Sequence, residues 1–282
     1  MNDAAQPDWL SLRRGNAPLL VSFPHTGTEL PEALAPCFVS PWLARKDADY
    51  WVHLLYDFAQ QLDASTVRTS ISRSVIDVNR DPSGASLYPG QTTTELCPLT
   101  SFDGEPLYRA GQEPDAGEIA ARRDKYYAPY HALLAGELAR LSALHGVVTL
   151  IDAHSIRSFV PRLFAGALPE LNLGNYDGKS CAAVLLAAAE QACVRSGFSW
   201  VVNGRFKGGY ITRHYGDPSG GVHALQLELA MRAYLCEPDA APAPNNWPPP
   251  YEPQRAAVLR EVLREIVGYC LEFARAAPGK EP

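Results

Sequence analysis

Short apolar runs alternate along the chain with longer segments that have helical spacing. The short runs are typical of buried strands, since each is apolar and is bounded by polar or turn-forming residues. These runs lie at residues 18–23, 66–70, 75–78, 147–151, 200–202 and 224–229. Amphipathic or alanine-rich segments that predict helices lie at residues 47–62, 115–144, 179–195 and 254–274, with a kink expected at Pro129. This alternation predicts an α/β fold in three layers, with helices on both faces of a mostly parallel central sheet.

Two long segments lack either pattern. Residues 82–114 are punctuated by glycine and proline and are too long for an ordinary connection, which predicts a lid or a pocket wall. Seven prolines between residues 238 and 253 predict an extended surface crossing before the last helix. The composition does not change before this crossing, and the last helix is too short to fold alone. One catalytic domain is therefore expected over residues 1–282.

Composition narrows the classes of function. The chain has 282 residues, 46% of them hydrophobic, so it can bury a large core. A net charge of −6 argues against a nucleic-acid partner, which normally shows as a basic excess. Six cysteines without a C-x-x-C pair indicate reduced thiols. With no secretory signal pattern and no apolar run near the roughly 20 residues of a membrane span, a cytoplasmic protein without a membrane partner is expected. The pattern gives no information on oligomeric state.

Two histidines follow strand-like runs. His25 comes just after residues 18–23, and His154 comes shortly after residues 147–151. Neutral imidazoles on a rigid scaffold, with one position left open for water, are the requirement of a catalytic zinc site. The sequence therefore predicts one divalent metal ion, with Zn²⁺ as the first candidate. Of the other histidines, His223 stays open, and His53, His131 and His145 lie in helical patterns and are interpreted as structural.

Arginines and an amide cluster around the run at residues 75–78. Arg73, Asn79 and Arg80 offer two guanidinium groups and an amide, and arginine binds carboxylates in a bidentate manner. A metal with carboxylate receptors indicates hydrolysis of an acidic amide. The alternative interpretation is an ordinary loop ion pair, either Asp77 with Arg80 or Asp81 with Arg73.

Six motifs in this order resemble one known family, the N-formylglutamate amidohydrolases. The motifs are PHTG at 24–27, DADYW at 47–51, SR at 72–73 with DVNR at 77–80, LY at 87–88 with FDG at 102–104, DAHS at 152–155 and GGYITRHYG at 208–216. The resemblance implies a phosphorylase/hydrolase-like α/β fold related to zinc-dependent exopeptidases. It also implies hydrolysis of N-formyl-L-glutamate to formate and L-glutamate, the last step of a histidine degradation route. Aspartoacylases and succinylglutamate desuccinylases are similar more distantly.

A carboxylate is expected to complete the metal site, and two candidates stay open. Asp49 matches the acidic pair of the family and opens a predicted helix. Glu29 is the competitor, because a short loop could return it to the metal. The more distant relatives place a glutamate three residues after the first metal histidine, but that position is Thr28 here and the nearest glutamate is Glu29. Asp152 is interpreted as a partner that holds a ligand imidazole in its working tautomer.

Glu228 lies near the end of the apolar run at residues 224–229. A carboxylate is costly to bury there without a task or a partner. It is therefore expected to be the general base and acid, which agrees with a glutamate after a late strand in exopeptidase-like relatives. The alternative is a salt bridge with Arg232, four residues later.

The remaining candidates bind a small acidic N-acyl amino acid. Arg73 is expected to donate to the oxyanion that develops opposite the metal. The resemblance implies that Asn79 and Arg80 hold one carboxylate, and Arg213 is expected to hold the other, with His214 and Tyr215 in the same pocket. Two alternative functions stay open. One is a deacylase for another N-acyl acidic amino acid, aspartoacylase-like or desuccinylase-like, and the other is a non-catalytic homologue that binds glutamate.

Overall fold

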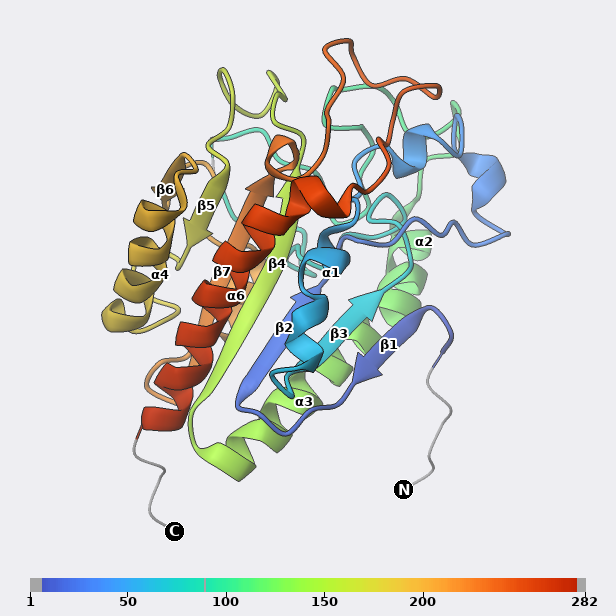
Figure 1. Ribbon diagram of the computed structural model, residues 1–282. Helices are drawn as coiled ribbons and strands as arrows, with labels where there is room; N and C mark the ends of the chain where they lie inside the picture. The colour runs from blue at the N-terminus through green and yellow to red at the C-terminus, as the bar shows by residue number, and fades with distance from the viewer. Residues whose placement is uncertain (1–6, 89, 278–282) are drawn as a thin grey trace.

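Seven strands form one mixed sheet in the order β1-β3-β2-β4-β7-β5-β6 (Figure 1). The computed structural model describes residues 7–88 and 90–277. The strands are β1 (Leu10–Arg13), β2 (Leu19–Phe23), β3 (Ser65–Thr69), β4 (Val148–Ile156), β5 (Leu171–Gly174), β6 (Trp200–Val202) and β7 (Val222–Ala230). The four central strands β3, β2, β4 and β7 are parallel, while β1 is antiparallel to β3 and β5 is antiparallel to β7. The prediction of a mostly parallel mixed sheet is confirmed.

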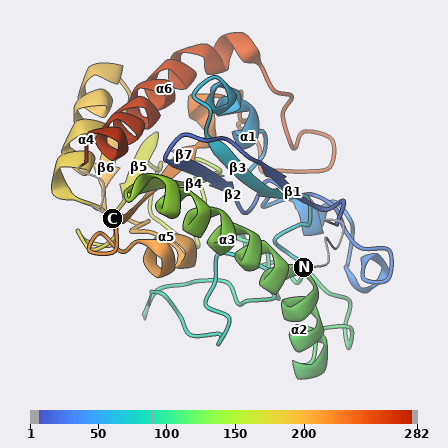
Figure 2. The ribbon, with the colours of Figure 1, turned by 90° about the horizontal axis from the view of Figure 1, so that it is seen from below.

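Helices cover both faces of this sheet (Figure 2). One face carries α1 (Val52–Leu55), α4 (Ala183–Ser196) and α6 (Pro253–Ala276). The other carries α2 (Ala116–Arg122), α3 (Ala128–His145) and the short α5 (Tyr210–Tyr215). The three-layer arrangement expected from the alternation of strands and helices is therefore confirmed.

The central strands are buried on both faces because their side chains alternate between two apolar clusters. In β2, Leu19 and Val21 pack in the cluster beneath α6, whereas Leu20 packs in the cluster beneath α3. In β4, Leu150 and Ile151 divide between the same two clusters. This period-two division explains why the central strands are continuously apolar in sequence.

Several elements differ from the expected ones. The helix expected at residues 47–62 is broken into α1 and flanking 3₁₀ turns, and Trp51 interrupts it with a left-handed φ of 64°. Residues 75–78 form turns rather than a strand, and β1, β5 and α5 were not predicted. The kink expected at Pro129 is a π-helical turn, Arg123–Tyr127, that ends just before the proline. The helix runs without a break from α2 through this turn into α3, so the wider π-helical turn accommodates a proline that lacks an N–H, and α3 continues to His145.

The proline-rich crossing packs against the segment around α1. The indole of Trp247 donates to the carbonyl of Lys46 at 2.9 Å, and those of Trp42 and Trp51 donate to the carbonyls of Trp247 and Pro249 at 3.1 and 3.0 Å. These bonds fasten the crossing to the segment that carries Asp49. The single domain expected over residues 1–282 stays a prediction. Among the described helices, none combines the length and the apolar character needed to cross a membrane.

Candidate active site and metal centre

Three predicted metal ligands meet at the carboxyl ends of β2 and β4. His25, Asp49 and His154 are buried, and one ligand atom from each lies within 4.8 Å of the other two. His25 follows β2 directly, whereas His154 lies inside β4, which continues to Ile156. Asp49 precedes α1, and its backbone N–H donates to the carbonyl of His25 at 2.9 Å. Two parallel strands and the segment before α1 thus bring three candidate ligands from distant parts of the chain to one edge of the sheet.

The atoms that face one another suit a metal ion. Asp49 Oδ2 lies 3.7 Å from His25 Nδ1 and 3.0 Å from His154 Nδ1. Within the described part of the chain, His25 Nδ1 and Asp49 Oδ1 are buried without a hydrogen-bond partner. Two imidazole nitrogens and a carboxylate are donors that zinc accepts, so this group could hold a metal ion. Glu29, the alternative ligand, is exposed and lies outside the group.

The other nitrogen of each imidazole lies beside a second polar group. Asp77 Oδ1 is 2.7 Å from His25 Nε2, and Asp152 Oδ1 is 3.0 Å from His154 Nε2. Asn79 Nδ2 also lies 2.8 Å from His154 Nε2. These contacts fix both rings with Nδ1 toward Asp49, as outer partners of metal-binding histidines do. The interpretation of Asp152 as such a partner agrees with this geometry, and Asp77 adds a second one.

The buried acids make the site favourable for positive charge. Burial acts to raise the pKa of Asp77, but Arg80, His25 and Arg73 outweigh it and hold that pKa well below its usual range. For His154, burial is outweighed by the neighbouring carboxylates, Asp152 first, and the pKa is raised well above its ordinary value. Burial, assisted by Arg73, instead lowers the pKa of His25. An ion of positive charge would therefore meet ionised carboxylates.

Glu228 lies beside His154 across the β4–β7 pair, where the two residues are in register. Its carboxylate is buried and accepts a hydrogen bond from Gln226 Nε2 at 3.0 Å. Burial raises the pKa of Glu228 to about 8. The alternative salt bridge does not form, because the nearest acidic partner of Arg232 is Glu170, 3.9 Å from its Nε.

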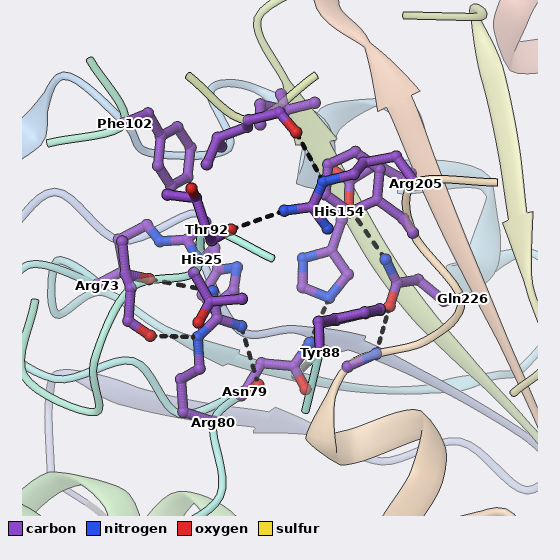
Figure 3. A pocket seen from close by; sticks show the side chains of 17 residues that line it. His25, Arg73, Asn79, Arg80, Tyr88, Thr92, Phe102, His154, Arg205 and Gln226 are labelled. Atoms are coloured by element: carbon purple, nitrogen blue, oxygen red, sulfur yellow. Dashed lines mark hydrogen bonds between the residues drawn. The ribbon is translucent and has the colours of Figure 1, made fainter. Parts of the chain in front are cut away.

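A cavity opens over this group (Figure 3). The predicted site residues that line it are His25, Arg73, Asn79, Arg80, His154 and Glu228. The segment at residues 82–114 supplies a wall of the cavity, as expected, through Tyr88, Thr92, Thr93, Thr94 and Phe102.

Arg73 and Asn79 are both held by other groups in the cavity wall. Arg73 Nη2 donates to Asp77 Oδ2 at 2.7 Å, so the expected alternative pairing with Asp81 is not the one formed.

The Asn79 oxygen accepts the N–H of Ile211 at 2.7 Å while its amide nitrogen approaches His154. Asn79 thus contacts an imidazole and also lines the cavity, and its expected contact with a substrate carboxylate stays a prediction. A Cβ at Gly209 would lie 2.4 Å from this amide nitrogen, which explains the glycine there.

Three predicted substrate contacts lie outside the cavity lining. The Arg213 guanidinium donates to the carbonyls of Gly208 and Leu87 at 2.8 and 2.7 Å. His214 is exposed, and the hydroxyl of Tyr215 lies 2.9 Å from His131 Nδ1. Arg213, His214 and Tyr215, which were expected to share the substrate pocket, therefore belong to α5 and do not line the cavity.

Sequence reasoning missed two polar residues near the ligands. Thr212 Oγ1 donates to Asp152 Oδ2 at 3.0 Å, and Arg205 lines the cavity from the loop after β6. The motif at residues 208–216 contains Thr212 but gave no reason to select it. No pattern marked Arg205, which follows a three-residue strand.

The fold is shared with solved structures of α/β proteins. An N-formylglutamate amidohydrolase from Ralstonia eutropha superposes with a TM-score of 0.74 at 21% identity, over 94% of this chain and 96% of that one. A protein from Agrobacterium tumefaciens superposes with a TM-score of 0.69 at 17% identity, over 95% and 96%. The fold and the buried donor group thus define an α/β protein with a candidate metal centre at the carboxyl edge of its sheet.

The sequence itself shows the family. A family model described as N-formylglutamate amidohydrolase matches residues 17–235, and the chain belongs to this family of hydrolases. The chain is 46% identical over 267 residues to an N-formylglutamate deformylase of Pseudomonas aeruginosa, with 94% of this chain and 97% of the relative covered. It is 42% identical to the enzyme of the same name from Pseudomonas putida, with 93% and 97% covered. The family membership predicted from the six motifs is confirmed.

Proposed function

We propose that this chain is a metal-dependent deformylase that hydrolyses N-formyl-L-glutamate to formate and L-glutamate, acting in the cytoplasm as the last step of a histidine degradation route. The names of its relatives support the substrate. The observation that carries the chemistry is the buried group of His25, Asp49 and His154, which shares one cavity with Glu228 and several arginines.

His25, Asp49 and His154 would hold the ion, through the atoms that face one another in the site. Two nitrogens and one oxygen are a common donor set for Zn²⁺ in hydrolases. When bound, zinc lowers the pKa of water and polarises a carbonyl oxygen, which are the two activations that hydrolysis of an amide needs.

Glu228 is the general base and acid of the reaction. Its carboxylate takes a proton from the attacking water and delivers it to the amide nitrogen, so that the C–N bond breaks and L-glutamate leaves as an amine. Its position beside His154 and on the cavity wall supports this role.

Two arginines act on the substrate in this mechanism. Arg73, held by Asp77 and 3.5 Å from Asp49, stabilises the negative charge that develops on the formyl oxygen. Arg80 binds one substrate carboxylate, and its Nε and Nη2 are fixed by the carbonyl and hydroxyl of Thr94 at 3.1 and 3.0 Å. A fixed guanidinium loses little freedom when a carboxylate binds.

Release of formate tests the proposal. The enzyme is assayed as purified, after removal of metal with a chelator, and after addition of Zn²⁺. We expect formate from N-formyl-L-glutamate in the first and third samples only, and much slower cleavage of the N-acetyl and N-succinyl analogues. The variant His154→Ala should lose both metal and turnover, and His145→Ala, outside the site, should keep both. Full activity in the metal-free enzyme would refute metal dependence, and preference for a longer acyl group would refute the substrate.

A further inference from the structure

Arg205 enters the cavity from the loop after β6 and is bound by neutral groups. Its Nε donates to the carbonyl of Leu163 at 2.8 Å, and its Nη2 donates to the carbonyl of Thr92 at 2.9 Å. The guanidinium also lies over the rings of Tyr88 and Phe206, 5.5 and 5.3 Å from their centroids. These contacts fix the guanidinium on the cavity wall. They use only some of its N–H donors, so others can bind a ligand.

Arg205 differs from the other arginines of the cavity in how far it lies from acidic side chains. Arg73 lies 2.7 Å from Asp77, and Arg80 lies 3.7 Å from the same carboxylate. No acidic side chain of residues 7–88 or 90–277 lies within ion-pairing distance of Arg205. Burial lowers the pKa of Arg205 and the like charge of Arg80 acts in the same direction, whereas Tyr88 and the negative charge of Glu228 act against them. A half-buried guanidinium with no acidic group at ion-pairing distance can bind an anion.

We propose that Arg205 binds the second carboxylate of the substrate, so that Arg80 and Arg205 together select a dianion. The inference rests on the proposed function, because it takes N-formyl-L-glutamate as the substrate. Figure 3 shows the two arginines at opposite sides of the view, with His25 and His154 between them. Binding of the second carboxylate, which the sequence pattern assigned to Arg213, is thus assigned to Arg205.

Arg213 supplies a matched control. It also donates to two backbone carbonyls and lies over Tyr88, with its guanidinium 4.6 Å from the ring centroid, but it does not line the cavity. Loss of its charge would disturb the segment at residues 82–114, which Arg205 also contacts, without removing a group from the cavity. The two variants Arg205→Gln and Arg213→Gln therefore separate carboxylate binding from loop stability.

The test compares N-formyl-L-glutamate with its two monoamides, one amidated at the α-carboxylate and one at the γ-carboxylate. The unmodified enzyme should have a higher KM for both monoamides than for the dianion. Arg205→Gln should raise KM for the dianion about 10- to 100-fold with a smaller change in kcat, as expected for the loss of a charged hydrogen bond. The Arg205→Gln enzyme should also no longer distinguish the dianion from one of the monoamides. That monoamide is the one that lacks the carboxylate held by Arg205.

Arg80→Gln should lose the preference against the other monoamide, and Arg213→Gln should keep both preferences. Arg205→Lys keeps the charge but not the planar guanidinium. Its KM for the dianion should therefore lie between those of the unmodified enzyme and Arg205→Gln. Calorimetric binding of L-glutamate to each folded variant gives a readout without turnover. An Arg205→Gln enzyme that keeps both preferences and an unchanged affinity for L-glutamate overturns the inference, while formate release by the unmodified enzyme leaves the proposed function intact. If the unmodified enzyme releases no formate, the proposed function fails before any variant is compared.

Discussion

Each imidazole of the donor group is oriented by a carboxylate that does not itself face the other ligands. Asp77 does this for His25 and at the same time binds Arg73 at 2.7 Å. Its Oδ1 also accepts the backbone N–H of Asn79 at 2.9 Å, and Asn79 in turn contacts His154. One buried acid therefore couples the metal ligands to the residue proposed to stabilise the oxyanion. Such support is what keeps a site within the narrow tolerance that catalysis needs.

Glu228→Gln is the sharpest test at the scale of one residue. The amide keeps the shape of the side chain and can still contact Gln226, but it cannot accept a proton from water. We expect turnover to fall about 10²- to 10⁴-fold, the usual contribution of general acid–base catalysis, with metal content unchanged. Formate release and elemental analysis of the same preparation measure the two quantities. Loss of metal together with activity would instead identify Glu228 as a ligand.

Glu29→Gln is the control for this experiment. Glu29 is exposed, and its backbone pairs with Ile71, so its side chain has no part in the donor group. The variant should keep both metal and turnover. If it lost metal, the donor set of His25, Asp49 and His154 would be wrong.

The sequence predicted which candidate metal ligands would lie together better than it predicted which arginines would line the cavity, for a physical reason. His25 and His154 follow apolar runs, and parallel strands place their carboxyl ends at one edge, so the pattern alone brings them together. Arg205 and Arg213 both follow glycine-containing stretches, where no periodicity tells which side chain enters a cavity. In the structure Arg213 belongs to the short helix α5 and binds the carbonyls of Gly208 and Leu87, whereas Arg205 lines the cavity.

At the scale of elements, strong patterns gave correct predictions and weak ones did not. The central strands β2, β4 and β7 and the helices α4 and α6 were predicted because burial imposes a clear period on them. Residues 47–62 have helical spacing, but the chain turns at Trp51 and fastens to the proline-rich crossing, so tertiary contacts override the local pattern. The edge strand β1 is four residues long and only one of its positions is fully buried, which leaves too little signal.

His131 in α3 should make the protein sensitive to acid. Its ring lies between Tyr127 and Tyr215, Nε2 is 2.8 Å from the carbonyl of Val78, and burial lowers its pKa to about 4. The unfolded chain binds a proton at the ordinary pKa near 6.5, whereas the native state does not, so stability falls as the pH drops from about 6.5 to about 4. The shift corresponds to at most about 3 kcal/mol of unfolding free energy.

Urea unfolding of the metal-free protein between pH 7 and pH 4.5 measures this contribution. The variant His131→Gln should be less stable at pH 7, because its contacts with Val78 and Tyr215 are weakened. Its stability should nevertheless decline less steeply toward acid than that of the unmodified protein. Parallel curves for the two proteins would show that His131 does not carry the acid sensitivity.

Considered as a whole, the molecule brings three candidate metal ligands from segments far apart in sequence to one buried point. His25 and Asp49 reach it from the N-terminal part of the chain, and His154 reaches it from the middle of the central strand β4. The group is surrounded by buried carboxylates, including Asp77 and Asp152, that are packed into the same core. Any ion held there would connect β2, the segment before α1, and β4.

Zinc should therefore stabilise the whole fold and not only the site. A ligand that binds the native state alone adds RT ln(1 + [L]/Kd), about 4 kcal/mol at a thousandfold excess over Kd. For a chain of this size, that gain corresponds to a rise in Tm of about 5–10 °C. Thermal unfolding of the metal-free protein, with and without Zn²⁺, should show this rise, and Glu228→Gln should show it too because its ligands are intact. His154→Ala should show little rise. An equal rise in His154→Ala would mean that zinc stabilises the protein from another position, and the proposed metal centre would then be wrong.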